Sequence, residues 1–326
     1  MRITVLGAGA WGTALARLLC DGKNRVTIWG HNAAHLEDLQ KTGRNERYLP
    51  GIELARELKL EADLTCAISG AECIVVAVPS KAFREVTQSL KNFSGIAVNV
   101  TKGIEYHTGL TMCSVLAQTA PQAKTAALSG PSFALEVARG IPTAIVVASD
   151  DAATAGAVQK LFHRPAFRVY TSNDLPGVEL GGALKNVIAI AAGVCDGLGF
   201  GDNSKAALVT RALAEIRRLG VACGAQAETF SGLSGLGDLM VTCFSKLSRN
   251  RSFGEQLGRG ENVKAIVKGM ISVAEGYPTA RSACELACKL NVVTPIIGEV
   301  HAVLYEGKNP GRALQDLTAR ELKAED

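Results

Sequence analysis

The sequence predicts two domains: an α/β domain with a doubly wound parallel sheet in residues 1–176, and an all-α domain in residues 177–326. In the first part, short β-rich runs alternate with helical stretches, and the runs are apolar on both faces. In the second part, long segments rich in alanine and leucine contain no convincing strand. The 34 glycines show no three-residue period, so they need local explanations.

The strands of the first domain are expected, in chain order, at residues 2–6, 25–29, 73–78, 96–100, 125–128, 144–148 and 167–170. Strands that are buried on both faces require helices on both sides of the sheet. Beyond the turn-forming residues 174–177, helices are expected at residues 180–195, 205–223, 273–290 and 295–305. No internal repeat of fixed period is visible.

The composition excludes several classes of protein. The chain has 326 residues, 47% of them hydrophobic, which is enough for two packed cores. Its 35 basic and 31 acidic residues are spread evenly, so we expect neither nucleic-acid binding nor a membrane-surface module. The longest apolar stretch, residues 183–200, is interrupted by Lys185, Asn186 and Asp196. No integral membrane association is expected, and the protein should be soluble.

The cysteines indicate a reducing compartment. There are nine, an odd number, without a CxxC motif, and the N-terminus does not resemble a signal peptide. We therefore expect reduced thiols and a cytoplasmic protein. Cys284 and Cys288 would share a helical face, but two thiols do not make a zinc site, so no metal is expected.

A glycine motif follows the first expected strand. Gly7, Gly9 and Gly12 form a GxGxxG that leads into a helix at residues 13–20. In a dinucleotide site the first glycine permits the turn, the second admits the pyrophosphate and the third lets helix and strand pack closely. The amide groups at the helix start would hold the phosphates. The alternative is a merely structural glycine turn.

The second strand bears on the choice of cofactor. It ends in Gly30-His31-Asn32, where an NAD-specific site usually carries an acidic residue. Without that acid a 2′-phosphate is tolerated, so both NADPH and NADH are expected as cofactors. His31 can supply a hydrogen bond or partial positive charge, or it is simply a solvated loop histidine.

Further loops should meet at the same edge of the sheet. They are the segments 78–80, 101–103 and 129–134, each directly after an expected strand. Lys102 can reach a phosphate or a carbonyl oxygen there, and Ser132 opens an expected helix at residues 133–139, a place for an anion. A surface lysine and an ordinary helix N-cap are the alternatives.

The second domain offers a lysine for proton transfer. Lys185 lies in residues 181–193, a helix that is apolar nearly all round and therefore buried. Burial lowers the pKa of a lysine and brings it into the range useful for general acid/base catalysis. In the alternative, the side chain extends to the surface.

A glycine-rich segment and a polar triplet complete the candidates. Asp238 and Thr242 are four residues apart and share one face of a helix that begins after the glycines, although Asp238 could be a helix N-cap. Ser248, Arg249 and Asn250 bring together a hydroxyl, a guanidinium and an amide, groups that suit a phosphate dianion. An exposed turn of a charged helix is the competing interpretation.

Together these residues favour the reduction of a phosphorylated ketone, with hydride passing to the carbonyl carbon and Lys185 donating a proton to its oxygen. A β-hydroxyacid dehydrogenase of the 6-phosphogluconate type is the nearest alternative, although the adjacent Lys185 and Asn186 speak against it. A non-catalytic NAD(P)H sensor is the other, and it would lack a credible proton carrier.

The chain also resembles the bacterial NAD(P)-dependent glycerol-3-phosphate dehydrogenases along essentially its whole length. The motifs that carry the resemblance are GAGAWGTALA (7–16), VPS (78–80), TKGIE (101–105), SGPSFA (129–134), ALKNVIAIAAG (183–193), GDNSKAALVTR (201–211), GLSGLGDLMVTC (232–243) and SRN (248–250). The resemblance implies a Rossmann-type first domain and a second domain of the 6-phosphogluconate dehydrogenase C-terminal-like type. It also implies reversible reduction of dihydroxyacetone phosphate to sn-glycerol 3-phosphate for phospholipid biosynthesis.

The resemblance assigns roles to particular residues. Lys185 is the implied proton acceptor in the oxidative direction, and Asp238 is named as the second catalytic residue. Implied at the cofactor, besides the three motif glycines, are Trp11, His31, Lys102, Ala134, Arg249, Val273 and Glu275. Implied around the substrate are Lys102, Gly130, Ser132, Lys185, Asp238, Ser248, Arg249 and Asn250. Ala10 stands where relatives often have serine. The apolar helices of the second half predict a homodimer.

Overall fold

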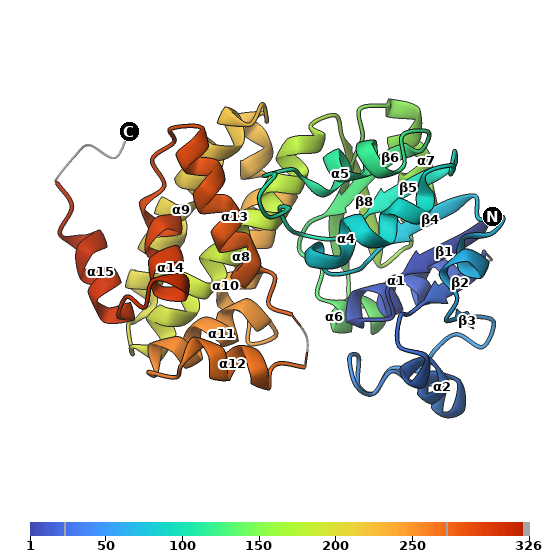
Figure 1. The fold of residues 1–326 in the computed structure, drawn as a ribbon, viewed down its shortest axis with the longest axis horizontal. Coiled ribbons are helices and arrows are strands. Elements are labelled where there is room, and N and C mark those ends of the chain that lie inside the picture. The colour runs from blue at the N-terminus through green and yellow to red at the C-terminus, as the bar shows by residue number, and fades with distance from the viewer. Residues whose placement is uncertain (23, 272, 322–326) are drawn as a thin grey trace.

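The first half of the chain is built around one sheet. The structure, a computed structural model, describes residues 1–22, 24–271 and 273–321, and Figure 1 shows the sheet with its helices on the right. Eight strands lie in the order β3-β2-β1-β4-β5-β6-β7-β8. Their bounds are Arg2–Leu6 (β1), Arg25–Trp29 (β2), Lys59–Glu61 (β3), Cys73–Val76 (β4), Ile96–Asn99 (β5), Lys124–Ser129 (β6), Thr143–Ala148 (β7) and Phe167–Ser172 (β8).

All seven expected strands are present, and one was missed. The missed strand is β3, whose three residues are too few to show a β pattern and whose ends are charged. The prediction of an all-parallel sheet is wrong for the last two strands. β7 runs antiparallel to β6, and β8 runs parallel to β7. An apolar run fits a sheet in either direction, so composition cannot reveal the reversal.

Helices cover both faces of the sheet, as a doubly wound fold requires. Ile3 and Val5 of β1 pack with α1 (Ala10–Cys20), α2 (Ala33–Thr42) and α7 (Ala152–Phe162) on one face. Leu6 faces the other side and packs with α3 (Leu64–Ile68), α4 (Ser80–Thr87) and α5 (Met112–Thr119). The short helix α6 (Ala134–Ala138) contacts α1. The carboxyl ends of β1, β4 and β5 therefore reach one edge together.

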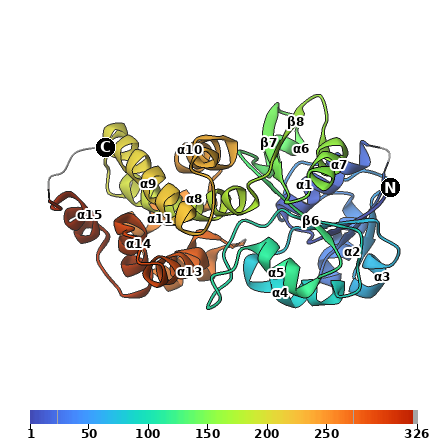
Figure 2. The ribbon, with the colours of Figure 1, turned by 90° about the horizontal axis from the view of Figure 1, so that it is seen from above.

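The second half is helical, as expected, and no strand lies beyond β8 among the described residues. Its α-helices are α8 (Leu175–Gly197), α9 (Asp202–Ala222), α10 (Asp238–Phe244), α11 (Arg249–Gly258), α12 (Val263–Gly269), α13 (Gly276–Lys289), α14 (Pro295–Tyr305) and α15 (Pro310–Thr318). In Figure 2, α8 runs from the sheet half into the middle of the helical half. It contacts α9, α10, α11, α13 and α14.

α8 also bears on where the two domains divide. It begins at Leu175, just before the expected limit at residues 176 and 177, and Leu175 and Val178 pack in the core of the sheet half. The first turn of α8 thus belongs to the sheet half by its packing. The last residues of the expected second domain, 322–326, lie outside the described residues.

By length and composition α8 could cross a membrane, the only such helix among the described residues. However, 94% of its most apolar window is buried inside the protein. Its hydrophobicity is accounted for by the helices packed around it.

Glycines allow α8 and α11 to approach closely. A Cβ on Gly193 of α8 would lie 1.9 Å from the carbonyl oxygen of Arg251, and one on Gly254 of α11 would lie 1.9 Å from that of Ile190. No side chain fits at such distances, so the two helix backbones are in direct contact. This contact fixes α11, and with it the polar triplet at residues 248–250, against α8.

We predict that Gly254→Ala destabilises the protein by about 2 kcal/mol or more, because the added methyl group must push the two backbones apart. Gly156 lies in α7, where a Cβ would meet nothing within 4 Å. The matched control Gly156→Ala should therefore stabilise by about 0.5–1 kcal/mol. Urea unfolding of both variants tests this, and equal midpoints would contradict it.

Candidate active site

The glycine motif shapes the start of α1. Gly7 has a φ of +121°, and a Cβ there would lie 2.6 Å from the carbonyl oxygen of Ala77. A Cβ on Gly12 would lie 1.9 Å from the carbonyl oxygen of Gly7, whereas one on Gly9, the N-cap of α1, meets nothing within 4 Å. Open space at Gly9, before the amide groups of a helix start, fits a pyrophosphate.

Two other expected cofactor residues lie beside this loop. Trp11 and Ala134 pack in one small apolar cluster, which brings α6 against the start of α1. Trp11 Nε1 is buried and has no hydrogen-bond partner among the described residues. His31 is exposed after β2, and Val273 is exposed with 48% of its surface accessible. The structure gives neither of these two a polar contact within the described residues.

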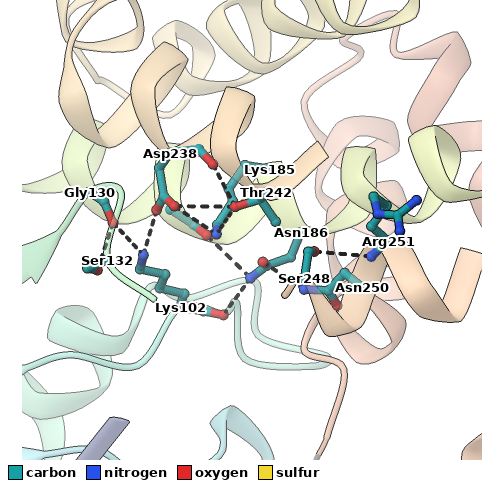
Figure 3. Close-up of polar contacts among 11 residues, drawn as sticks. Lys102, Gly130, Ser132, Lys185, Asn186, Asp238, Thr242, Ser248, Asn250 and Arg251 are labelled. Carbon is teal, nitrogen blue, oxygen red and sulfur yellow. Dashed lines mark hydrogen bonds and ion pairs between the residues drawn. The ribbon is translucent and has the colours of Figure 1, made fainter. Parts of the chain in front are cut away.

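A buried carboxylate joins two lysines from different halves of the chain. Asp238 Oδ2 lies 2.5 Å from Lys102 Nζ, and Asp238 Oδ1 lies 2.8 Å from Lys185 Nζ. Figure 3 shows Asp238 and Thr242 facing Lys185, with Lys102 approaching from the sheet half. Lys185 Nζ also donates to Thr242 Oγ1 at 2.6 Å, and that hydroxyl donates to the carbonyl oxygen of Asp238. Lys185 is buried, so it does not extend to the surface.

This cluster sets the protonation of Lys185. Burial lowers its pKa to about 8, and Lys102 adds to the lowering, while Asp238 and more weakly Cys243 oppose it. Burial alone would raise the pKa of Asp238, but Lys102 and Lys185 outweigh it and hold that pKa below the ordinary value. The site therefore holds an ionised carboxylate and a lysine that can gain or lose a proton near neutral pH.

Lys102 is held in turn by the loop after β6. Its Nζ donates to the carbonyl oxygen of Gly130 at 2.9 Å, and Ser132 Oγ donates to the same oxygen at 2.9 Å. Gly130 has a φ of +137°, a conformation that favours glycine. Ser132 is not the N-cap of α6, because that helix begins at Ala134 after Phe133. The expected helix at residues 133–139 is correspondingly shorter.

An amide network places the α11 start beside Lys185. Asn250 Nδ2 donates to Asn186 Oδ1 at 2.9 Å, and Asn250 Oδ1 accepts the N–H of Gly276 at 2.9 Å. Ser248 is the N-cap of α11 and accepts the N–H of Arg251 at 3.2 Å. Ser248 and Asn250 are buried, so the competing interpretation of an exposed turn holds only for Arg249.

Arg249 and Glu275 lie close together, and Glu275 also contacts the sheet half. Surrounding protein atoms lower the pKa of the Arg249 guanidinium, and Glu275 opposes that shift. Glu275 Oε2 accepts the hydroxyl of Ser80 at 2.6 Å, and its Oε1 accepts the N–H of Ser80 at 3.2 Å. Glu275 thus links the start of α13 to the start of α4. Burial raises the pKa of Glu275.

The structure therefore gathers Lys102, Gly130, Ser132, Lys185 and Asp238 directly, and Asn250 is joined to them through Asn186. Ser248 caps the same helix start as Asn250. Sequence reasoning left Asn186, Thr242 and Ser80 out of the site. The four-residue spacing places Thr242 on the same helix face as Asp238, but without a role in the site. Only the folded chain brings Ser80 to Glu275.

Among the described residues, no group of three His, Cys, Asp or Glu side chains could hold a metal ion. Cys284 and Cys288 lie on α13, the first partly buried and the second exposed.

The first half of the chain has a doubly wound sheet with a glycine loop, and the helices of the second half supply a buried lysine. This combination is typical of the two-domain dehydrogenases that use pyridine nucleotides. Two family models refine this class. The model described as NAD-dependent glycerol-3-phosphate dehydrogenase N-terminus matches residues 2–155, and the one described as the C-terminus matches residues 174–315. The chain belongs to the NAD-dependent glycerol-3-phosphate dehydrogenase family.

Individual members of this family are similar to the chain over nearly its full length. A glycerol-3-phosphate dehydrogenase [NAD(P)+] of Anaeromyxobacter dehalogenans is 51% identical over 331 residues, with 100% of both chains covered. The enzyme of the same name from Desulfotalea psychrophila is 49% identical, covering 99% of this chain and 98% of the relative. The crystal structure of glycerol-3-phosphate dehydrogenase from Coxiella burnetii superimposes with a TM-score of 0.95 at 39% identity, covering 98% of this chain and 99% of that one.

We predict that Gly9→Val leaves the stability unchanged, since its side chain meets open space, but weakens NADH binding by about tenfold or more, because it occupies the pyrophosphate position. Fluorescence titration with NADH measures the binding, and urea unfolding provides the control. An unchanged Kd in a fully folded variant would remove Gly9 from the cofactor site.

Proposed function

We propose that this protein reduces dihydroxyacetone phosphate to sn-glycerol 3-phosphate with NADPH or NADH, reversibly, and so supplies glycerophospholipid biosynthesis. The observation that carries the proposal is the buried Lys185, held by Asp238 at the sheet edge where the glycine loop lies. Membership of the family supports the same conclusion.

The bound cofactor supplies a hydride to the substrate carbon. Lys185 then donates its proton to the carbonyl oxygen, and in the oxidative direction the neutral amine takes the proton back. Asp238 orients both lysines through its two oxygens. Lys102 places a second positive charge where negative charge develops on the substrate oxygen.

We assign the substrate phosphate to the start of α11. Ser248, Arg249 and Asn250 present groups that form charge-assisted hydrogen bonds with a dianion. Gly130 and Ser132 border the same space through the loop that holds Lys102.

We assign the cofactor to the glycine loop and the residues around it. Gly7, Gly9 and Gly12 hold the pyrophosphate. The remaining contacts come from Trp11, His31, Lys102, Ala134, Arg249, Val273 and Glu275. Arg249, Val273 and Glu275 belong to the helical half, so the cofactor would contact both halves of the chain.

We further propose a cytoplasmic homodimer with domains at residues 1–176 and 177–326. All nine cysteines are free, which suits a reducing compartment. Leu236, Met240, Phe244 and Leu247 are exposed apolar side chains in and around α10, and apolar surface of this kind suits a subunit contact.

Initial rates with dihydroxyacetone phosphate, measured in parallel with NADH and NADPH, test the activity directly. Turnover with at least one of the two cofactors is expected. Oxidation of a hydroxy acid without any turnover of dihydroxyacetone phosphate would overturn the proposal.

Lys185→Ala should lower kcat by roughly 10²–10⁴-fold, because the proton donor is removed. The glycine loop is untouched, so the Kd for NADH should stay the same. Steady-state kinetics and fluorescence titration measure the two quantities. A near-normal kcat would remove Lys185 from proton transfer.

The pH dependence should reverse between the two directions. With a pKa of about 8, Lys185 is protonated below that pH, which favours reduction, and neutral above it, which favours oxidation. We therefore expect the rate of reduction to fall, and the rate of oxidation to rise, as the pH passes through about 8. Profiles of kcat against pH in both directions check this. Two rates that both rise, or both fall, as the pH passes through this range would contradict the prediction.

A further inference from the structure

Lys102 needs support beyond its own ion pair. Its side chain must reach across from the sheet half to a carboxylate on α10, so the backbone of residues 101–103 has to be fixed relative to the helical half. A misplacement of about 1 Å in such a site can cost about 100-fold in rate. The residues that fix this backbone therefore bear on catalysis.

The support begins at the end of β5. Asn99, the last residue of that strand, is buried, and its Oδ1 accepts the N–H of Thr101 at 2.8 Å. The Thr101 hydroxyl donates to the carbonyl oxygen of Val78 at 2.7 Å. These two bonds set the direction in which the chain leaves the sheet, immediately before Lys102.

Asn99 is oriented by a buried carboxyl group on α8. Its Nδ2 donates to Glu179 Oε1 at 2.8 Å, and the same oxygen accepts the N–H of Cys113, in the first turn of α5, at 2.9 Å. Because Nδ2 faces a carboxyl oxygen, Oδ1 must face Thr101, so Glu179 selects the orientation of the amide. Glu179 lies six residues before Lys185 on the same helix.

Burying the carboxyl group of Glu179 at this position costs free energy of folding. Burial raises the pKa of Glu179, and Glu179 Oε2 is buried without a hydrogen-bond partner among the described residues. A buried oxygen without a hydrogen-bond partner lowers the stability of the folded protein, and the bonds made by the other carboxyl oxygen must offset that loss. Its other oxygen joins three segments, the end of β5, the start of α5 and the helix that carries Lys185.

We propose that Glu179 is a positioning residue for the reaction: acting through Asn99 and the N–H of Thr101, it places Lys102 against Asp238 in register with Lys185. The chain of contacts is Glu179 to Asn99, Asn99 to Thr101, and the backbone of Thr101 to Lys102. Glu179 touches neither substrate nor cofactor in this scheme. The inference rests on the proposed reduction of dihydroxyacetone phosphate.

The test uses the exchange of donor and acceptor between the two side chains. Glu179→Gln keeps an oxygen for Asn99 and Cys113, so its kcat should stay close to that of the parent protein. Asn99→Asp places a second carboxyl group against Glu179 and should lower kcat roughly 10- to 100-fold. The double variant Asn99→Asp with Glu179→Gln restores a donor facing residue 99, but the same amide nitrogen then faces the N–H of Cys113, so its kcat should recover only part of that loss.

The pH profile separates positioning from mere destabilisation. Lys102 helps to lower the pKa of Lys185, so displacing Lys102 should move the change in rate near pH 8 to higher pH in Asn99→Asp and in Glu179→Leu. Glu215 is a matched control, a buried glutamate on α9 that accepts the N–H groups of Ile296 and Ile297. Glu215→Leu should lower the free energy of unfolding, while the pH at which the rate changes should stay the same.

The outcomes separate the two proposals. An inactive parent protein would refute the proposed function. If the parent is active and the pH at which the rate changes is the same in Asn99→Asp and Glu179→Leu as in the parent, the role of Glu179 is refuted. If Glu179→Leu does not fold, the Asn99→Asp and Glu179→Gln variants decide the matter alone.

Discussion

The carboxylate of Asp238 is the constraint on which the site depends. It is buried, and it remains ionised because Lys102 and Lys185 each approach one of its oxygens. One lysine comes from the sheet half and the other from α8, so the same carboxylate that holds Lys185 also joins the two halves. Without it, two ammonium groups would face each other in a desolvated space.

The helices of the second half surround Lys185 and keep its side chain buried. α8 is surrounded by five other helices, which exclude water from Lys185 and lower its pKa. The glycine contacts with α11 bring the amide of Asn250 to Asn186, directly beside that lysine. Close backbone packing therefore forms the core and also brings the start of α11 next to Lys185.

Two glutamates connect the halves near this site in different ways. Glu275 reaches from α13 to Ser80 at the start of α4, and Arg249 lies close to it. Glu179 reaches from α8 to the end of β5. Each places a carboxyl group where a strand of the sheet ends, which is where ligands bind in doubly wound folds. The two halves are thus joined here by specific polar contacts.

The sequence by itself determined the class of fold, the glycine loop, the buried Lys185 and most of the site, because alternating apolar runs, glycine spacing and a lysine in an apolar helix each have a local physical cause. Only the tertiary structure decided the reversed direction of β7 and β8, since an apolar strand fits a sheet either way. It also decided the pairs Asp238 with Lys102, Glu275 with Ser80, and Glu179 with Asn99. These join residues between 80 and 195 positions apart, and no local pattern records which buried polar groups will meet.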